Sequence, residues 1–408
     1  MSASQTGAVA KKDLRYYSLD FWRGVACLMV AFVHSTAYIT ENPAHVSGGF
    51  VSRKIFSLLG QGFAGVPIFF VISGYCIAAA CESAMNKKLP TKQFFFRRFK
   101  RIFPPYWAVL LGLVALHLGF QFFRGANYLV DDIAPMSKPT DLSVVQWLGT
   151  ITLTEGWRDN LFGDPSRLFL TPAWSLCYEE QFYFVCGMAM LFGRKWFYRL
   201  MAWLSVAVLA VAVINNSVVA LPINGFFFDG RWLMFAAGVL VFYVLQFGTE
   251  RSRKQAIYLL AFAFCAALAY WYRQHTAKTQ QMFYITMARQ MFCCFPVAIL
   301  LIVLFKHDRR IYESRLLRPL TLCGVMCYSV YLVHIPVEKI MTQFFYRAGL
   351  QGDWSTLLIS IPISILMAVL VAWGFYFLVE RRFLNTPPPM SRDQKPAPAE
   401  EASVPAGV

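Results

Sequence analysis

The sequence predicts an all-α, polytopic membrane protein in which about ten transmembrane helices surround a polar cavity. Three observations support this fold class. Hydrophobic residues make up 57% of the 408 residues and charged residues only 15%, which is far more apolar than an ordinary soluble domain. The apolar residues lie in runs of about 20, the length that a helix needs to cross a bilayer. The basic residues behind the net charge of +16 lie in short clusters between these runs, a pattern that favours membrane topology over nucleic-acid binding.

The first apolar run begins after the basic stretch "KKDLR", as a signal peptide would. The run is long, however, and no small-residue cleavage site follows it, so we predict a retained first span. Two later runs, 198–215 and 256–272, are short for a span. The complete set of predicted spans is 19–40, 62–82, 104–123, 172–193, 198–215, 226–247, 256–272, 283–305, 319–345 and 355–379.

Basic residues in alternate connections predict the orientation of the chain, because loops rich in lysine and arginine stay cytoplasmic. Both termini are therefore expected in the cytoplasm, and an even number of spans agrees with this. We expect residues 1–17 to form a cytoplasmic tail, 18–384 a single transmembrane domain, and the proline-rich segment 385–408 a disordered cytoplasmic tail. The basic connections are 87–101, 193–199, 249–254, 306–318 and the tail from 380.

All ten cysteines lie inside the apolar runs or at their ends. Their spacing matches neither a disulfide framework nor a zinc site. We therefore interpret them as small buried hydrophobic residues and expect no metal.

Two ionisable residues in the first span, Arg23 and His34, are separated by eleven residues. That spacing is close to three helical turns, so both side chains are expected on one face, roughly 16 Å apart along the helix axis. Asp20, three positions before Arg23, can pair with it. Ionisable groups inside spans usually face a protein interior or a water-filled cavity. The first helix is therefore expected to present polar groups at two depths.

Several other spans carry ionisable residues in the half of the membrane that the predicted orientation makes extracytoplasmic. The spans alternate in direction, so polar residues at one fixed position along each span would alternate between the two halves of the membrane. A polar cavity opening outward is a simpler explanation for their common side. These residues are Glu179 and Glu180 in the fourth span, Asp229 and Arg231 in the sixth, Arg289 in the eighth, and His334 and Glu338 in the ninth.

Several of the polar residues also have a structural interpretation. Arg23 can extend to the cytoplasmic interface, and a lone membrane histidine such as His34 often only bonds neighbouring helices. Asp229 can cap its helix. The basic cluster at 97–101 can be a topology signal alone.

Six motifs resemble, in the same order, those of the membrane acyltransferase-3 family, which includes polysaccharide O-acetyltransferases. The resemblance extends over about residues 18–384. This sequence departs from the family pattern at Pro67, where an acidic residue is frequent, and at Arg382, where proline is common. The motifs are "LDFWRGVACLMVAFVH" (19–34), "GVPIFFVISGY" (65–75), "RRFKRIFPPYW" (97–107), "PAWSLCYEEQFY" (172–183), "YSVYLVHIPV" (328–337) and "ERRF" (380–383).

The resemblance implies transfer of an acyl group, usually acetyl from cytoplasmic acetyl-CoA, to a hydroxyl of an extracytoplasmic or lipid-linked carbohydrate at the bacterial inner membrane. His34 is expected to act as the base or as a transient acyl carrier, because the pKa of histidine lies near neutrality. Glu179 would orient His34, and Arg23 would bind the donor through its forked guanidinium. We expect substrate contacts from Asp20, Ser73, Gly74, Arg97, Arg98, Arg101, Trp174, Ser175, Arg289 and His334, with the three arginines at 97–101 on the CoA phosphates.

A transporter or flippase is the main alternative, because midplane charges and outward cavities are also typical of such proteins. The sequence shows no internal repeat and no paired, Gly/Pro-interrupted spans in its two halves, which disfavours this alternative. A scaffold protein with a relic site is a third possibility. Membrane lipids are expected partners, nucleic acid is not, and the oligomeric state is left open.

Overall fold

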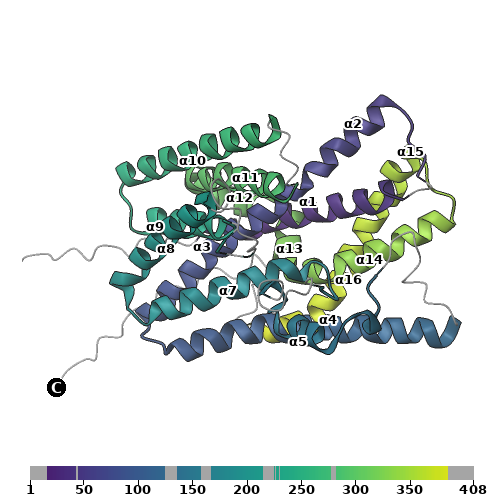
Figure 1. The fold of residues 1–408 in the computed structure, drawn as a ribbon, viewed down its shortest axis with the longest axis horizontal. Coiled ribbons are helices and arrows are strands. Elements are labelled where there is room, and N and C mark those ends of the chain that lie inside the picture. The colour runs from purple at the N-terminus through teal and green to yellow at the C-terminus, as the bar shows by residue number, and fades with distance from the viewer. Residues whose placement is uncertain are drawn as a thin grey trace, which may run out of the picture.

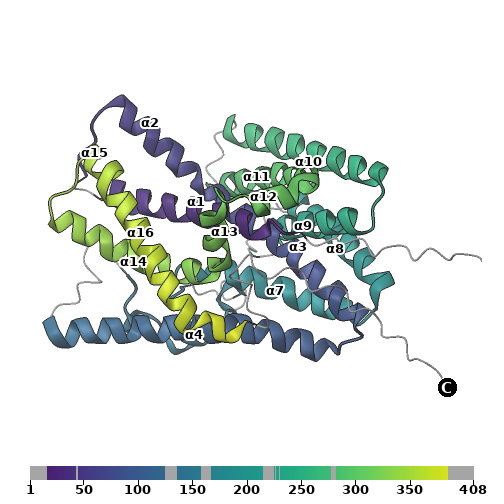
Figure 2. The same ribbon diagram turned by 180° about the vertical axis from the view of Figure 1, so that it is seen from behind.

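The structure, a computed structural model, describes residues 16–42, 45–124, 136–157, 167–214, 225, 227–228, 230–276 and 282–384. The predicted tails, apart from residues 16–17, lie outside these residues. Long helices run side by side through the described part of the chain (Figures 1 and 2), and its only β-type pairing is an isolated bridge between Val46 and Gly352. The prediction of an all-α fold is confirmed.

The principal helices follow the predicted apolar runs, with additional short helices between them. They are α1 (Leu19–Thr40), α2 (Phe50–Leu59), α3 (Gly65–Asn86), α4 (Thr91–Arg124), α5 (Val144–Thr152), α7 (Ala173–Met190), α8 (Arg194–Ile214), α9 (Trp232–Gln246), α10 (Glu250–Thr276), α11 (Met282–Leu304), α12 (Asp308–Glu313), α13 (Arg318–Val325), α14 (Cys327–Arg347), α15 (Asp353–Ser355) and α16 (Ile361–Leu378).

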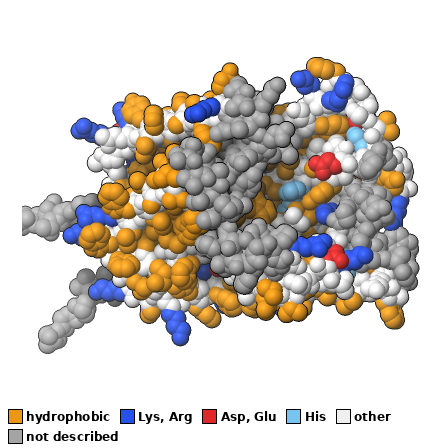
Figure 3. Space-filling view, in the orientation of Figure 1, with side chains coloured by type: hydrophobic (Ala, Val, Ile, Leu, Met, Phe, Trp, Pro, Cys, Tyr) orange, Lys and Arg blue, Asp and Glu red, His pale blue; other side chains and the backbone are white. Residues whose placement is uncertain are grey.

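Each predicted run contains at least part of a helix, but fewer than ten helices qualify as spans by length and apolarity. Within the described residues there are 6 such helices, or 7 if the bent pair α13–α14 is counted as one span. The chain is thus a multi-pass membrane protein, while ten spans and the orientation stay predictions. On the face seen in Figure 3, hydrophobic side chains cover much of the surface, and lysine and arginine lie mainly toward the two ends of the bundle. The six helices are Leu19–Thr40, Phe50–Asn86, Thr91–Phe122, Arg194–Ile214, Glu250–Arg273 and Asp353–Leu378.

The basic segment before the third predicted span is helical, where a connecting loop was expected. The helix α4 begins at Thr91 and continues through Pro104 and Pro105. Hydropathy indicates where a chain enters the membrane, not where its helix begins, so a span predicted from 104 is compatible with a helix that begins at Thr91. The arginines at 97–101 are therefore held on a regular helix.

The ninth predicted span, 319–345, is not one continuous helix. It is broken at Met326, and α13 and α14 meet at an angle of 83°. The first turn of any helix has backbone N–H groups without partners in the helix. In α14 the amide of Ser329 donates to Glu380 Oε2 at 3.0 Å, and the Ser329 hydroxyl donates to the same oxygen. Burial raises the pKa of the Glu380 carboxyl, whereas these bonds favour its charged form.

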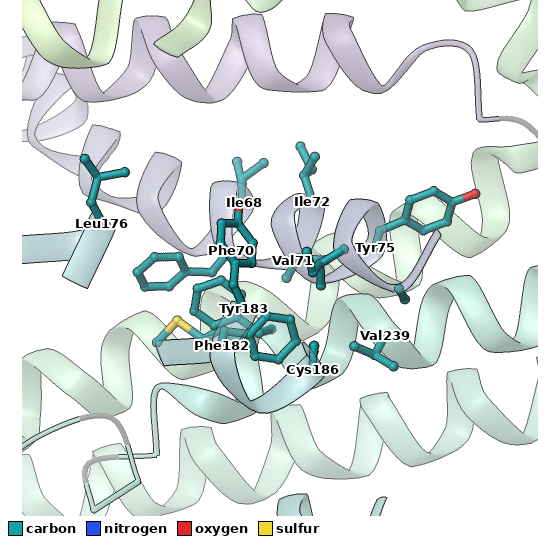
Figure 4. Packing of buried hydrophobic residues seen from close by; sticks show 14 of the residues in the cluster. Ile68, Phe70, Val71, Ile72, Tyr75, Leu176, Phe182, Tyr183, Cys186 and Val239 are labelled. Atoms are coloured by element: carbon teal, nitrogen blue, oxygen red, sulfur yellow. The ribbon is translucent and has the colours of Figure 1, made fainter. Parts of the chain in front are cut away.

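The centre of the bundle is a closely packed set of aromatic and aliphatic side chains from α3, α7 and α9 (Figure 4). Phe235 of α9 stacks on Phe70 of α3 and on Phe182 of α7, with 4.6 Å between ring centroids in both pairs. This core fixes α3 and α7 side by side, which places their polar residues in reach of each other.

The crossing of α1 and α13 depends on two glycines. At the crossing of α1 and α13, a Cβ on Gly24 would collide with the Leu320 carbonyl, and one on Gly324 with the Asp20 carbonyl. Small residues allow helix backbones to approach this closely inside a membrane. The contact holds the Asp20 and Arg23 turn of α1 against α13.

Replacing Gly324 with leucine is therefore expected to lower the free energy of unfolding by about 1–3 kcal/mol, because the added atoms would push α13 away from α1. Thermal unfolding of the detergent-solubilised protein, followed by intrinsic fluorescence, measures the effect. Gly374→Leu in α16 is the matched control, because a Cβ there meets no atom within 4 Å. Equal thermal midpoints for the two variants would contradict a packing role for Gly324.

A carboxylate joins the loop after α1 to the start of α15. Asp353 accepts a hydrogen bond from Gly48 N at 2.8 Å and one from Ser52, and it lies 2.9 Å from His45 Nε2. Figure 1 shows α2 and α15 at the same end of the bundle.

Candidate active site

Two histidines from distant parts of the sequence meet between α1 and α14. The ring centroids of His34 and His334 are 5.5 Å apart, and His34 stacks on Tyr38 at 5.7 Å. His334 is buried and His34 is half-buried. The structure therefore brings together two residues that the sequence placed only at similar depth.

The hydrogen bonds of His334 determine which of its ring nitrogens can act as a base. Nδ1 lies 3.0 Å from the Val330 carbonyl and 2.8 Å from the Tyr331 carbonyl. Carbonyl oxygens only accept hydrogen bonds, so Nδ1 carries the proton of the neutral ring. Nε2 is buried and has no hydrogen-bond partner within the described part of the chain. Its lone pair is free to accept a proton.

A buried carboxyl lies one turn further along α14. Glu338 is fully buried; its oxygens make no hydrogen bond of standard geometry among the residues described, and the Ser35 hydroxyl of α1 lies close enough to interact with its carboxyl. The Lys339 ammonium lies 5.3 Å from the Tyr38 ring centroid, on the α1 side of the same region. An unpaired polar group is costly inside a membrane bundle and usually has a function. We call His34, Tyr38, His334, Glu338 and Lys339 the histidine cluster.

A second polar group lies between α3, α4 and α7. Ser73 Oγ donates to Glu179 Oε1 at 2.9 Å, and the Tyr183 hydroxyl donates to the same oxygen. The Arg98 guanidinium lies over the Tyr183 ring, 5.3 Å from its centroid. We call Ser73, Arg98, Glu179, Glu180 and Tyr183 the glutamate cluster.

The position of Glu179 bears on its expected role. Its described hydrogen bonds go to Ser73 and Tyr183, and none of the contacts in the described residues joins it to His34. Its neighbour Glu180 has one buried oxygen without a described partner and lies within electrostatic range of Arg98. The imidazole that the structure brings to His34 is instead that of His334, which sequence reasoning had assigned only to substrate binding.

Tyrosine and serine hydroxyls connect α7 with α14. Ser175 Oγ and the Tyr331 hydroxyl are 2.9 Å apart, and Tyr331 also donates to the Pro172 carbonyl. The Tyr331 ring lies 6.3 Å from His334. Ser175 and Tyr331 therefore link α7 to the part of α14 that carries His334.

Trp174, also expected to line the site, lies under the Arg231 guanidinium at 5.1 Å from the ring centroid. Arg231 also donates a hydrogen bond to the Tyr178 hydroxyl. A cation over an aromatic face is a stabilising arrangement. This part of α7 is thus fixed against the start of α9.

Arg23 forms the predicted pair with Asp20, with 2.7 Å between Nη1 and Oδ1. Its Nη2 donates to Cys76 Sγ of α3 at 3.0 Å. The predicted i, i+3 pair is confirmed. Because α1 is a continuous helix, Arg23 and His34 lie roughly 16 Å apart along it, at two depths of the bundle.

The three arginines at 97–101, in the N-terminal half of α4, have different surroundings. Arg97 is exposed, whereas Arg98 is half-buried against the glutamate cluster. Arg101 lies within electrostatic range of Glu380. Only Arg98 and Arg101 therefore face groups in the interior of the bundle.

Three further sequence-predicted residues are not brought to either cluster by a described contact. Gly74 lies against the backbone of Phe235 in α9, and this packing alone requires a glycine. Arg289 is on α11, but its side chain is outside the described part of the structure, and Asp229 lies outside it altogether.

Residues 16–377 match the model of a family described as an acyltransferase domain. A segment of 143 residues is 35% identical to the peptidoglycan O-acetyltransferase OatA of Listeria monocytogenes, covering 35% of this chain and 22% of that protein. A segment of 167 residues is 28% identical to protein 2 in the picA locus of Rhizobium radiobacter, covering 40% of this chain and 77% of that protein. No solved structure matches the chain.

Proposed function

Because the chain belongs to the acyltransferase-3 family, we propose that it transfers an acyl group, in the simplest case acetyl, to a hydroxyl of a carbohydrate. The observation that carries this proposal is the pair of imidazoles, His34 and His334, with a free ring nitrogen inside the bundle. The listerial relative is named for O-acetylation of peptidoglycan, which supports a cell-envelope glycan or its lipid-linked precursor as the acceptor. The proposed location is the bacterial inner membrane.

The donor in this proposal is cytoplasmic acetyl-CoA. Under the predicted orientation, the N-terminal half of α4 lies at the cytoplasmic surface, where Arg98 and Arg101 can bind the nucleotide phosphates by charge-assisted hydrogen bonds. The pantetheine arm would then extend between the helices toward Arg23. A guanidinium has five N–H donors, and the described contacts of Arg23 use two of its nitrogens. The remaining donors suit the amide carbonyl oxygens of the pantetheine arm, which would hold the arm on its way to His34.

The histidine cluster supplies the base. His34 takes the proton of the acceptor hydroxyl while the hydroxyl oxygen attacks the thioester carbon. The carbon–sulfur bond then breaks, the acetyl ester remains on the carbohydrate, and the CoA sulfur leaves as a thiolate that is protonated to the thiol. His334 packs against the His34 ring, and its free Nε2 offers the next acceptor for the proton. A covalent acyl-histidine route would use the same side chain of His34.

The test uses the purified full chain in liposomes, radiolabelled acetyl-CoA and a cell-envelope glycan fraction as acceptor. Label is expected in the glycan, with release of one CoA thiol for each acetyl ester formed. The His34→Gln protein prepared in the same way is the matched control. Movement of glycan across the liposome membrane without label in it would favour the transporter alternative and contradict the proposal.

A further inference from the structure

A long apolar groove lies away from the histidine cluster, between α8, α9 and α10. Its volume is about 850 Å³. In Figure 1 these helices gather with α11 at one end of the bundle, opposite α2 and α15. Alanines on α9 and α10 leave the space that larger side chains would fill. Representative lining residues are Leu209 of α8, Ala236 and Ala237 of α9, Ala263 and Ala267 of α10, and Phe295 of α11.

The groove has few polar groups available for water. Ser205, on the α8 wall, donates to the Met201 carbonyl at 2.7 Å and accepts from Trp232 Nε1 at 2.9 Å. Both Ser205 and the indole are thus satisfied within the protein. The outer helix α10 packs little against the rest of the protein, since only 11% of its most apolar 18-residue stretch is buried. An apolar groove open to the bilayer is most stable when it is filled by hydrocarbon.

Positive charge is concentrated at one end of the groove. Arg199 lines this end, near the start of α8, and Lys195 lies one turn before it. Arg251 and Lys254 lie at the start of α10. These four side chains are exposed, and none has an ion-pair partner among the described residues. The occupant should therefore carry a negative charge at one end and hydrocarbon along its length.

We propose that the groove is a binding site for an anionic phospholipid of the cytoplasmic leaflet, with one acyl chain along α9 and its phosphate at Arg199. From Arg199 to Val213, α8 rises roughly 21 Å. One leaflet of hydrocarbon is about 15 Å thick, so the groove can hold an acyl chain along its whole length. The positive-inside rule places the basic end in the cytoplasmic leaflet, where anionic lipids attract lysine and arginine. This site is independent of the proposed acyl transfer.

Native mass spectrometry of the delipidated full chain tests the proposal, with phosphatidylglycerol and phosphatidylcholine of identical acyl chains as probes. Phosphatidylglycerol is expected to bind more tightly. Arg199→Gln should weaken its binding about fivefold and leave phosphatidylcholine unchanged, because one cation near a headgroup contributes roughly that factor. Arg315→Gln, which removes an exposed cation outside the groove, is the matched control and should bind as the unaltered protein does.

A second variant tests the apolar part of the site. Ala236→Phe, which fills the floor of the groove, should reduce binding of both lipids, and circular dichroism checks that it is folded. Equal retention of the two lipids by the unaltered chain would show unspecific annular lipid and overturn the proposal. Unchanged phosphatidylglycerol binding in Arg199→Gln would do the same. Displacement of phosphatidylglycerol by an equimolar polyprenyl phosphate would overturn the assignment to a phospholipid.

Discussion

Replacement of His34 by glutamine is expected to lower kcat for acetyl transfer by about 10²- to 10⁴-fold, the range that a positioned general base contributes. Glutamine is similar to histidine in size and keeps a hydrogen-bonding group beside His334, but its amide cannot take a proton from the acceptor hydroxyl. The helix contact between α1 and α14 should therefore survive while the chemistry is lost. The measurement is the initial rate of label transfer from acetyl-CoA to the glycan fraction, with thermal unfolding as the check on folding.

His307→Gln provides the matched control for this experiment. His307 lies in a short helical turn between α11 and α12, outside both clusters, and its loss should leave the rate unchanged. Full activity of His34→Gln would show that His34 serves only as a contact between helices and not as the base. In His334→Gln, a partial loss of kcat would indicate a positioning role. A loss equal to that of His34→Gln, with no further loss in the double variant, would show that the two imidazoles act as one unit.

Helical periodicity was sufficient to predict two features of the site, the Asp20–Arg23 pair and the similar depth of the two histidines. Three positions separate Asp20 and Arg23, which is enough to predict the ion pair that the structure contains. The directions of the predicted spans placed His34 and His334 at similar depth, and their rings do meet. Both inferences use only the rise and repeat of a helix, which are fixed by backbone geometry.

Lateral neighbours could not be predicted in the same way. Glu179 was expected at a depth similar to that of His34, but which helices are adjacent depends on packing, and α7 presents it to Ser73 of α3. The break at Met326 had no hydropathy signal, and the first turn of α14 after it donates to Glu380, 51 residues away from Ser329. Gly74, read as a lining residue from a motif, is a close contact with α9. A sequence gives the positions along each helix, whereas these features depend on contacts between helices.

The second large effect is expected in α4, where replacing Arg98 by glutamine should raise the KM for acetyl-CoA about tenfold. A charge-assisted hydrogen bond contributes about 1.5–3 kcal/mol, and 1.4 kcal/mol already corresponds to a factor of ten. Arg98 is held over Tyr183 at the edge of the glutamate cluster, so its guanidinium is positioned before the donor binds. Initial rates at varied acetyl-CoA and saturating glycan measure the effect, which should lie mainly in KM because the phosphates do not react.

Arg97→Gln distinguishes a binding role for Arg98 from a general loss of positive charge. The two arginines are adjacent in sequence and equal in charge, but Arg97 is exposed and Arg98 is half-buried. If α4 only marks the cytoplasmic side, both substitutions should leave KM unchanged; if local charge alone attracts the nucleotide, both should raise it equally and salt should mask the effect. A phosphate site built on Arg98 instead requires a larger rise for Arg98→Gln than for Arg97→Gln. It also predicts only partial recovery in Arg98→Lys, which restores the charge but not the forked geometry.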